Sequence, residues 1–324
     1  MTKAAHWAFV AAFACLAAAA AARAQAQDYP SRPVRVLVGF PAGSSADITA
    51  RIVTQHMGRS LGQQFVVEAK PGAGSSLAAD LVAHGSKDGY TLLQGTIANP
   101  INAIINSNLS FDFIHDFAPI ARLVTTPNIL VVHPSVRVKS VRELIDLAKA
   151  KPDQLTYASS GVATGTHLAA ELFKLLTGVK MVHVPYGGSP QAVTDLVAGR
   201  VQVFFSPAST AIQHVREGKL VALASTEAKR AAIAPDLPTM LEAGVPDFAT
   251  GLWFGLLAPA GTPAEIIGKL NRAANEALDS EEVIKALAVQ GIDPVGGSPQ
   301  DFAEFLQGEI KRWTAVALAA GLKK

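Results

Sequence analysis

After Pro33, short apolar runs alternate with longer stretches of helical pattern along almost the whole chain. This alternation restricts the fold more than any other feature, because parallel strands can be joined only by long crossover connections, which are usually helices. We therefore predict an α/β fold built on parallel strands. The predicted strands are 34–40, 65–68, 91–94, 128–132, 155–158, 181–184, 201–205, 220–225 and 253–258.

Hydroxyl residues mark the starts of the predicted helices. Ser44 is followed three residues later by Asp47, and Ser140 by Glu143, which is the spacing of a capping box. Beyond such a start, apolar residues recur along one side of the helix, as in the stretch 48–61. Stripes of this kind pack against a sheet, so we assign them to the core rather than to function.

Two parts of the chain follow the same local plan. Residues 71–75 and 185–189 each follow a predicted strand, and each precedes a helix that ends in Asp-Leu-Val-Ala, at 80–83 and 195–198. We infer two α/β lobes built on one plan, with the second inserted into the first. The predicted boundaries place residues 27–124 and 252–324 in lobe 1 and residues 125–251 in lobe 2.

The first 26 residues have the pattern of an export signal peptide. Lys3 gives the positive start, an alanine-rich apolar stretch runs over 7–22, and Ala24-Gln25-Ala26 forms a small-x-small cleavage site. No later apolar run approaches the roughly 20 residues that span a bilayer. We predict cleavage near Ala26 and a periplasmic, monomeric mature protein.

Charge and cysteine content exclude several classes of function. The chain has 28 basic and 26 acidic residues, and loss of Lys3 and Arg23 with the leader leaves 26 of each, which argues against a nucleic-acid partner. Cys15 is the only cysteine and lies in the leader, so the mature chain has no disulfide and no cysteine nucleophile. The alternative is a lipoprotein that begins at Cys15, but Ala12 stands where a lipobox usually has leucine.

Motifs for nucleotide binding, metal binding and hydrolysis are missing from the sequence. It contains no G-x-G-x-x-G, no P-loop, no H-E-x-x-H and no G-x-S-x-G. The histidines are scattered, although His167 lies seven residues after Ser160, which leaves a chance catalytic pair open as an alternative. We predict no catalytic residue, no metal and no cofactor.

Small polar residues fill the loops that follow the predicted strands, and these loops contain no Lys or Arg. Ligands of open α/β sheets bind at this edge, where free N–H groups at helix starts carry about half a positive charge and can hold an anion. Ser44 and Ser45 fit a helix cap and a ligand contact equally well. The predicted ligand-binding residues are Gly43, Ser44, Ser45, Asp47, Gly74, Ser75, Ala98, Asn99, Ser159, Ser160, Gly161, Thr164, Tyr186, Gly187, Gly188 and Ser206.

Several short motifs occur in a fixed order over the mature chain, including Phe40-Pro41-Ala42-Gly43, Lys70-Pro71-Gly72-Ala73-Gly74, Tyr157-Ala158-Ser159-Ser160-Gly161 and His183-Val184-Pro185-Tyr186-Gly187-Gly188. In these motifs the chain resembles the solute-binding receptors of tripartite tricarboxylate transporters, the Bug family. The resemblance implies a two-lobed periplasmic binding protein of the type II kind, with the ligand cleft between the lobes. It also implies that the receptor closes on a small carboxylate, holds it with backbone amides and hydroxyls, and delivers it to an inner-membrane permease.

The chain departs from the resembled pattern at positions near the predicted site. Ser75 stands where family members usually have glycine, and Gln202 stands where aspartate is common. Asp47 is the only acid of the predicted site, and its place in the capping box leaves nothing to neutralise an ammonium group. We therefore expect a carboxylate ligand without an ammonium group. Two alternatives stay open: a binder that presents its ligand to a sensor protein, and a periplasmic enzyme.

Overall fold

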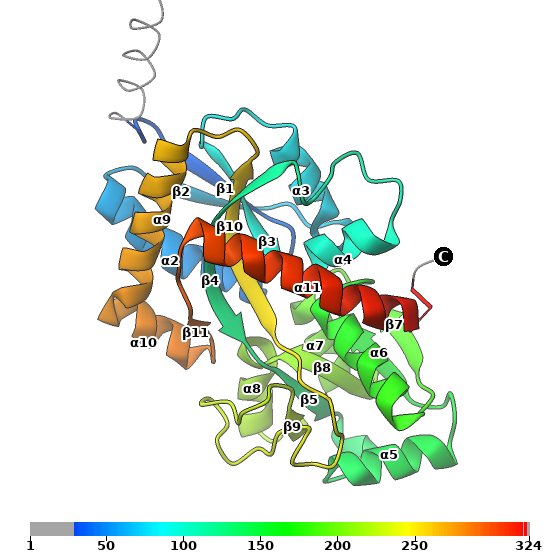
Figure 1. Ribbon diagram of the computed structural model, residues 1–324. Helices are drawn as coiled ribbons and strands as arrows, with labels where there is room; N and C mark the ends of the chain where they lie inside the picture. Colours follow the sequence, from blue (N-terminus) through cyan, green and yellow to red (C-terminus); the bar gives the residue numbers. More distant parts are fainter. Residues whose placement is uncertain (1–28, 320, 323–324) are drawn as a thin grey trace, which may run out of the picture.

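The computed structural model describes residues 29–319, 321 and 322. The predicted signal peptide and its cleavage site near Ala26 lie outside the described residues. Within them, helices and strands alternate in two lobes, each organised around its own sheet (Figure 1).

The sheet of lobe 1 has six strands in the order β11-β4-β10-β3-β1-β2. Strand β1 is parallel to β2 and β3, whereas β10 is antiparallel to β3 and to β4. The strands are β1 (Val34–Val38), β2 (Phe65–Ala69), β3 (Thr91–Thr96), β4 (Phe117–Thr126), β10 (Leu252–Pro259) and β11 (Asp293–Pro294).

Helices cover both faces of this sheet (Figure 1). On one face α2, α9 and α10 pack against one another, and on the other α3, α4 and α11 do so. These helices are α2 (Ser45–Leu61), α3 (Ser76–Ala83), α4 (Ala98–Ile105), α9 (Ala264–Asp279), α10 (Glu281–Val289) and α11 (Pro299–Ala319).

The sheet of lobe 2 has five strands in the order β7-β6-β8-β5-β9. Alternate residues of strand β5, which lies between β8 and β9, face two separate cores: Leu130 packs with α5 and α6, and Ile129 packs with α7 and α8. This alternation is what a strand covered by helices on both faces requires. The elements are β5 (Asn128–Val132), β6 (Thr156–Ser159), β7 (Val182–Pro185), β8 (Val203–Pro207), β9 (Val221–Ser225), α5 (Val141–Ala150), α6 (Gly165–Thr177), α7 (Ser189–Val197) and α8 (Ala208–Arg216).

Both sheets have the same internal order, as the recurring loop and helix plan predicted. Strands β2-β1-β3-β10-β4 of lobe 1 correspond to β7-β6-β8-β5-β9 of lobe 2, with three parallel strands followed by an antiparallel one. The chain crosses between the lobes twice, once before β5 and once before β10, and these are the antiparallel strands of the two sheets. Only Pro127 separates β4 from β5, so one crossing is direct. The exact boundaries at 124/125 and 251/252 stay a prediction.

The C-terminal helix α11 joins the two lobes. It lies across β4, α4 and α6 (Figure 1), and its residue Val316 packs against the cores of both lobes. The buried carboxylate of Glu309 anchors it, because the indole N–H groups of Trp253 and Trp313 both donate to Oε2, at 3.0 and 3.1 Å. This helix therefore contacts both lobes at once.

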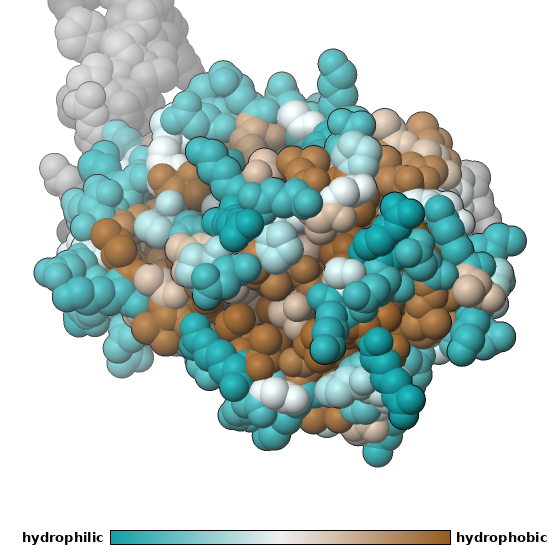
Figure 2. All heavy atoms as spheres, turned by 90° about the horizontal axis from the view of Figure 1, so that it is seen from below, coloured by the Kyte–Doolittle hydropathy of each residue, from teal (hydrophilic) through white to brown (hydrophobic). Residues whose placement is uncertain are grey.

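The described part of the chain has no helix that is long and apolar enough to cross a membrane. Seen from below, polar side chains surround the molecule, and apolar residues show between them near the middle of the face (Figure 2).

Candidate functional site

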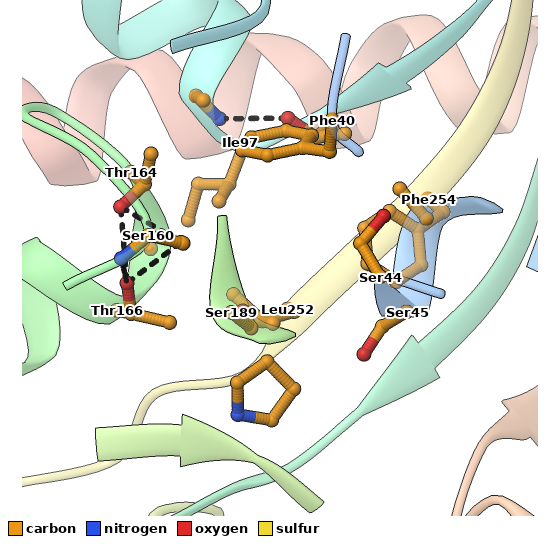
Figure 3. Close-up of a pocket in the computed structure, with 15 residues that line it drawn as sticks. Phe40, Ser44, Ser45, Ile97, Ser160, Thr164, Thr166, Ser189, Leu252 and Phe254 are labelled. Carbon is orange, nitrogen blue, oxygen red and sulfur yellow. Dashed lines mark hydrogen bonds between the residues drawn. The ribbon is translucent and has the colours of Figure 1, made fainter. Parts of the chain in front are cut away.

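A cavity lies between the lobes, at the ends of strands from both sheets (Figure 3). Its volume is about 30 Å³, the room of a water molecule or two. The loops after β1 and β3 form its wall in lobe 1, and the loop after β6 with the start of α7 forms its wall in lobe 2. The lining residues are Phe40, Ser44, Ser45, Ala46, Thr96, Ile97, Ala98, Ser160, Thr164, Gly165, Thr166, Ser189, Pro207, Leu252 and Phe254.

The start of α2 forms one end of the cavity. Ser44 is the N-cap, and its Oγ accepts the backbone N–H of Asp47 at 3.3 Å. The carboxylate of Asp47 accepts the N–H of Gly43 at 3.0 Å and forms an ion pair with Arg51, one helical turn later, at 2.9 Å. Gly43 has φ of +77°, a left-handed conformation that favours glycine. Asp47 and Gly43 therefore shape the turn, while Ser44 and the next residues face the cavity.

Two backbone N–H groups at this helix start have no partner. Among the described residues, no hydrogen bond involves the N–H of Ser45 or of Ala46, and both residues are buried. The Ser45 hydroxyl forms a short hydrogen bond with the hydroxyl of Ser209, which belongs to lobe 2. The start of α2 is thus a positive helix end, turned toward the cavity and in contact with the opposite lobe.

Three hydroxyls of lobe 2 form a closed group on the facing wall (Figure 3). Ser160 Oγ lies 3.2 Å from Thr164 Oγ1 and 2.9 Å from Thr166 Oγ1, and these threonine oxygens are 3.0 Å apart. Thr166 Oγ1 also accepts the backbone N–H of Ser160 at 2.9 Å. Because hydroxyls can rotate to donate or accept, this group can turn its hydrogens toward an anion.

Helix α6 begins beside these hydroxyls without a side-chain cap. Thr164 occupies the N-cap position but gives no capping hydrogen bond, and within the described chain the N–H groups of Gly165 and Thr166 have no partner. Gly165 lies so close to lobe 1 that a Cβ there would stand 2.3 Å from the side chain of Leu252. A buried helix start without capping partners is unusual and is the geometry of an anion site.

The start of α7 completes the wall in lobe 2. Ser189 lines the cavity, and the N-cap Gly188 touches the opposite lobe, where a Cβ on it would stand 2.7 Å from Pro41 Cδ. Tyr186 instead turns to its own lobe, where its hydroxyl donates to Asp195 at 2.9 Å. Burial and then this hydrogen bond raise the pKa of Tyr186 to about 12.

A separate hydrogen-bond group holds the loop before α3 against α4. Asn99 accepts the N–H of Thr96 at 2.8 Å and donates to Ser75 Oγ at 3.2 Å. Asn102 donates to the carbonyl of Gly74 at 3.1 Å. Ser75 has φ of +76°, which is uncommon for serine, so these contacts hold a strained loop in place. The group supports Thr96, which lines the cavity.

No lining residue is charged. The starts of α2, α6 and α7 reach the cavity from two lobes, and their N–H groups supply the positive potential instead. Among the described residues there is also no group of three or more His, Cys, Asp or Glu that could hold a metal ion.

The structure brings together part of the predicted site. Ser44, Ser45, Ala98, Ser160 and Thr164 line the cavity. The remaining predicted residues do not line the cavity and lie in the adjoining loops, helix starts and strand ends: Gly43, Asp47, Gly74, Ser75, Asn99, Ser159, Gly161, Tyr186, Gly187, Gly188 and Ser206.

Several lining residues were not among the predicted ones. Thr96, Gly165, Thr166 and Ser189 stand in the same small-residue loops, so the loop pattern could have included them. The apolar members carry no such signal, because their sequence pattern is that of core residues: Phe40, Ala46, Ile97, Pro207, Leu252 and Phe254.

Comparison with known proteins places the chain among transport receptors. A family model described as "Tripartite tricarboxylate transporter family receptor" matches residues 49–322. Protein BugT of Bordetella pertussis is 37% identical over 305 residues, which are 94% of this chain and 94% of that protein. A protein from an intergenic region of Pseudomonas sp. strain P51 is 36% identical over 293 residues, which are 90% of this chain and 87% of that protein.

Solved structures of similar proteins share the fold. R. palustris Rpa4515 with adipate has a TM-score of 0.88 and 37% sequence identity, covering 91% of this chain and 99% of that chain. MatC from Rhodopseudomonas palustris with bound malate has a TM-score of 0.84 and 34% identity, covering 89% of this chain and 99% of that chain.

Proposed function

The chain belongs to the tripartite tricarboxylate transporter receptor family, and we propose that its cavity captures a small carboxylate with an apolar body and no ammonium group. Members of this family are periplasmic solute receptors. We also propose a periplasmic location for the mature chain, delivery of the ligand to an inner-membrane permease, and no catalytic activity.

One observation carries the proposal: helix starts with unpaired N–H groups, α2 from lobe 1 and α6 from lobe 2, face an uncharged cavity. The N–H groups of Ser45 and Ala46 in lobe 1 and of Gly165 and Thr166 in lobe 2 are buried and unpaired within the described chain. A buried N–H without a partner is costly, and a carboxylate oxygen can accept from such groups on both sides at once. No lining acid is present to hold an ammonium group.

The rest of the lining supports an apolar ligand body. Phe40 and Ile97 lie together on one side, and Leu252 and Phe254 come from the strand that returns to lobe 1 (Figure 3). These side chains offer no hydrogen bond to a hydroxyl on the ligand, so burying such a hydroxyl against them would carry a desolvation cost. Among the acids found with similar proteins, adipate has an apolar chain and malate carries a hydroxyl. We expect adipate-like acids to bind better.

Entry of such a ligand requires the lobes to separate. The cavity of about 30 Å³ is smaller than a dicarboxylate, and lobe-to-lobe contacts close it, including the Ser45–Ser209 hydrogen bond and the approach of Gly188 to Pro41. We propose a hinge motion that opens the cleft and then closes it on the ligand.

A thermal-shift panel on protein beginning at Gln27 tests the function. The panel contains adipate, hexanoate, malate, glutamate and hexylamine, and the protein is first unfolded and refolded to remove carried-over ligand. We expect adipate or hexanoate to raise Tm, with about 2.7 kcal/mol of added stability at one hundred times Kd. Glutamate and hexylamine should leave Tm unchanged. A panel without any carboxylate effect, or a stronger effect of hexylamine, would refute the proposal.

A further inference from the structure

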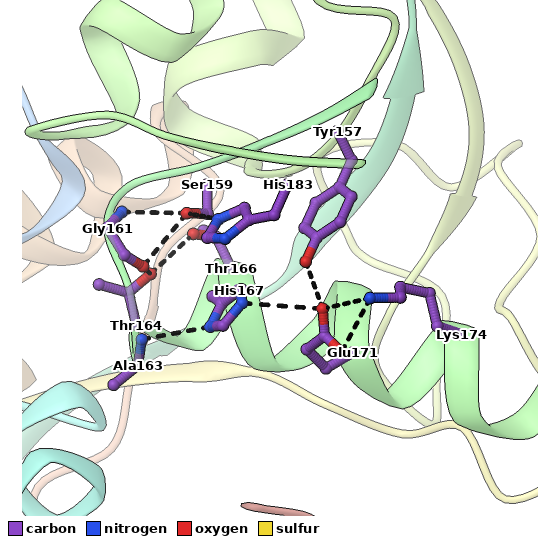
Figure 4. Close-up of polar contacts among 10 residues, drawn as sticks. All are labelled: Tyr157, Ser159, Gly161, Ala163, Thr164, Thr166, His167, Glu171, Lys174 and His183. Carbon is purple, nitrogen blue, oxygen red and sulfur yellow. Dashed lines mark hydrogen bonds and ion pairs between the residues drawn. The ribbon is translucent and has the colours of Figure 1, made fainter. Parts of the chain in front are cut away.

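Two histidines, the buried His167 and the half-buried His183, stack directly behind the loop that lines the cavity in lobe 2 (Figure 4). The rings of His167 on α6 and His183 on β7 are 4.1 Å apart between centroids and nearly parallel, at 17°. The ring of Tyr157 on β6 also stacks with both histidines, at 4.8 Å from His183 and 6.4 Å from His167. The function proposed above uses neither histidine, since neither lines the cavity.

Both histidines are hydrogen-bonded to the loop between β6 and α6. His167 Nδ1 accepts the backbone N–H of Ala163 at 3.2 Å. His183 Nε2 shares a hydrogen bond with Ser159 Oγ at 2.6 Å, and Ser159 in turn contacts the backbone N–H and carbonyl of Gly161. An Nδ1 that accepts cannot carry a proton, so His167 is neutral with its proton on Nε2.

The loop needs this support because its backbone is strained. Ala163 has φ of +63° and Gly161 has φ of +131°. Alanine rarely adopts the left-handed region, and such a conformation persists only where the surroundings enforce it. Ala163 is fully buried, and its one N–H is directed to the His167 ring.

The same loop has two contacts that matter for ligand capture. Ser160 and Thr164 line the cavity, and Ala163 packs into the hydrophobic core cluster of lobe 1. Leu168, one helical turn after Thr164, belongs to that cluster as well. The conformation of this loop therefore sets both the position of the α6 N–H groups and the surface on which lobe 1 closes.

Burial, more than the charged groups around it, keeps His167 neutral. It faces His183 on β7, Tyr157 on β6, and Glu171 and Lys174 on its own helix. Burial and then the neighbouring His183 lower the pKa of His167 to about 4, and the attraction of Glu171 opposes them only in part.

Glu171 itself is held as a carboxylate. Burial opposes its ionisation, but hydrogen bonds from Lys174, at 2.8 and 3.0 Å, and from the Tyr157 hydroxyl outweigh burial and lower the pKa of Glu171. Its Oε1 lies 3.7 Å from His167 Nε2, the nitrogen that carries the proton (Figure 4). The carboxylate thus favours the tautomer that leaves Nδ1 free to accept.

We propose that His167 is a positioning residue for ligand capture: its Nδ1 acceptor, oriented by Glu171 and stacked on His183, fixes the 159–164 loop in the shape that binds the carboxylate. This inference rests on the proposed function for its ligand. It assigns His167 to a role in affinity although the side chain never reaches the cavity.

Three variants separate this role from plain stability. His167→Leu removes the acceptor and keeps an apolar side chain in the buried site. His167→Asn restores an acceptor, since Asn Oδ1 and His Nδ1 are both attached to Cγ and so lie the same number of bonds from Cβ. His133→Leu is the matched control: His133 Nδ1 accepts the N–H of Ser135 at 3.2 Å, a contact of the same kind, but at the other end of the lobe 2 sheet.

Two readouts are needed, hydrogen exchange of the Ala163 amide without ligand and calorimetric affinity for adipate. In His167→Leu we expect the Ala163 amide to exchange at least about tenfold faster and adipate affinity to fall about fivefold to 150-fold, the range for an unsatisfied buried N–H. His167→Asn should stay within about threefold of the wild type in both readouts, and His133→Leu should match the wild type in both.

The inference fails if His167→Leu keeps wild-type exchange at Ala163, or if His167→Asn is as weak as His167→Leu. If His167→Leu does not fold, the inference is tested by comparing His167→Asn with the wild type. Loss of adipate affinity in folded His167→Asn then overturns the inference. A wild type that binds no carboxylate of the panel refutes the proposed function instead, and the ligand-free exchange of Ala163 then decides the role of His167.

Discussion

Gly188 shows how a single residue limits closure of the cleft. Its φ of 172° is extended backbone that any residue can adopt, so a larger side chain causes no backbone strain there. A Cβ would nevertheless stand 2.7 Å from Pro41 Cδ in the opposite lobe, which is closer than real atoms approach. The need for glycine at this position comes from the meeting of the lobes.

We therefore expect Gly188→Val to lower adipate affinity at least about tenfold, because the valine side chain would keep Pro41 of the opposite lobe from its close contact with residue 188 when the lobes close. The Tm of the unliganded protein should change little. Gly308→Val on α11 is the control, since a Cβ at Gly308 meets nothing within 4 Å. Isothermal titration calorimetry measures the affinities. Wild-type affinity in Gly188→Val would show that the liganded protein does not use this approach of the lobes.

Ser160 tests how the charge of the ligand is held. Its hydroxyl is one of three in the lobe 2 wall, and each neutral hydrogen bond contributes about 0.5–1.5 kcal/mol. Ser160→Ala should weaken adipate binding about threefold to tenfold and leave the fold intact, as seen by circular dichroism. A complete loss of binding would mean that this hydroxyl, rather than the helix starts, holds the carboxylate.

The polar residues of the site were easier to predict than the apolar ones. Ser44 with Asp47 has a cap spacing that only a helix start explains, and the ion pair of Asp47 with Arg51 follows from their separation of one helical turn. Leu252 and Phe254 have no such signature. They line the cavity because β10 passes between the lobes, and a contact of that kind depends on the whole topology.

Among the elements, the ten-residue β4 and the two-residue β11 are the strands that the sequence did not reveal, and β4 is the more instructive. It contains Pro119 and Arg122 and ends in two threonines, so its apolar pattern is broken. The strand forms because β10 pairs with it along nearly its full length, with two register shifts. Formation of β4 therefore depends on pairing with a strand far away in the sequence. The strands that alternate with helices on both sides could instead be predicted from the local sequence pattern.

The unit formed by β6, α6 and β7 carries a pH dependence of its own. His167 has a pKa of about 4 in the folded protein against 6.5 for the free side chain, so between these values the unfolded chain binds the extra proton. Its contribution to stability is complete above pH 6.5 and is lost as pH falls to about 4, a change of about 3 kcal/mol. His183, whose pKa burial also lowers, acts in the same direction.

His167→Asn should remove this contribution. Urea unfolding from pH 4 to 7 gives the free energy of unfolding of both proteins. The free energy of the wild type minus that of His167→Asn should rise with pH over this window. A difference that stays constant with pH would mean that His167 titrates alike in the folded and unfolded chains, and that its surroundings do not hold it neutral.

For the whole molecule, the crossings between the lobes hold a group with the opposite behaviour. Glu227 follows β9 and approaches both crossing segments: Thr125 at the end of β4 is among the groups that influence its pKa, and its Oε1 would lie 3.1 Å from a Cβ at Gly251. Burial and then the nearby Asp293 raise the pKa of Glu227 to about 7, with the Thr125 hydroxyl opposing them. The hinge thus contains a carboxyl group that is half protonated near neutral pH.

The contribution of Glu227 to the free energy of unfolding is complete below pH 4.5, the pKa of the free side chain. As pH rises through about 7, up to about 3 kcal/mol of this contribution is lost. Between pH 4.5 and 6.5 it opposes His167 and His183, so the stability of the wild type should rise with pH less steeply than the two histidines alone would make it rise. Glu227→Gln keeps the shape of the side chain but cannot ionise, so the stability of this variant should rise more steeply with pH from 4.5 to 6.5 than that of the wild type. Adding His167→Asn to Glu227→Gln should make the rise shallower again. Urea unfolding of the four proteins decides the matter, because a Glu227→Gln profile no steeper than that of the wild type would show that the Glu227 carboxyl is ionised throughout and does not oppose the histidines.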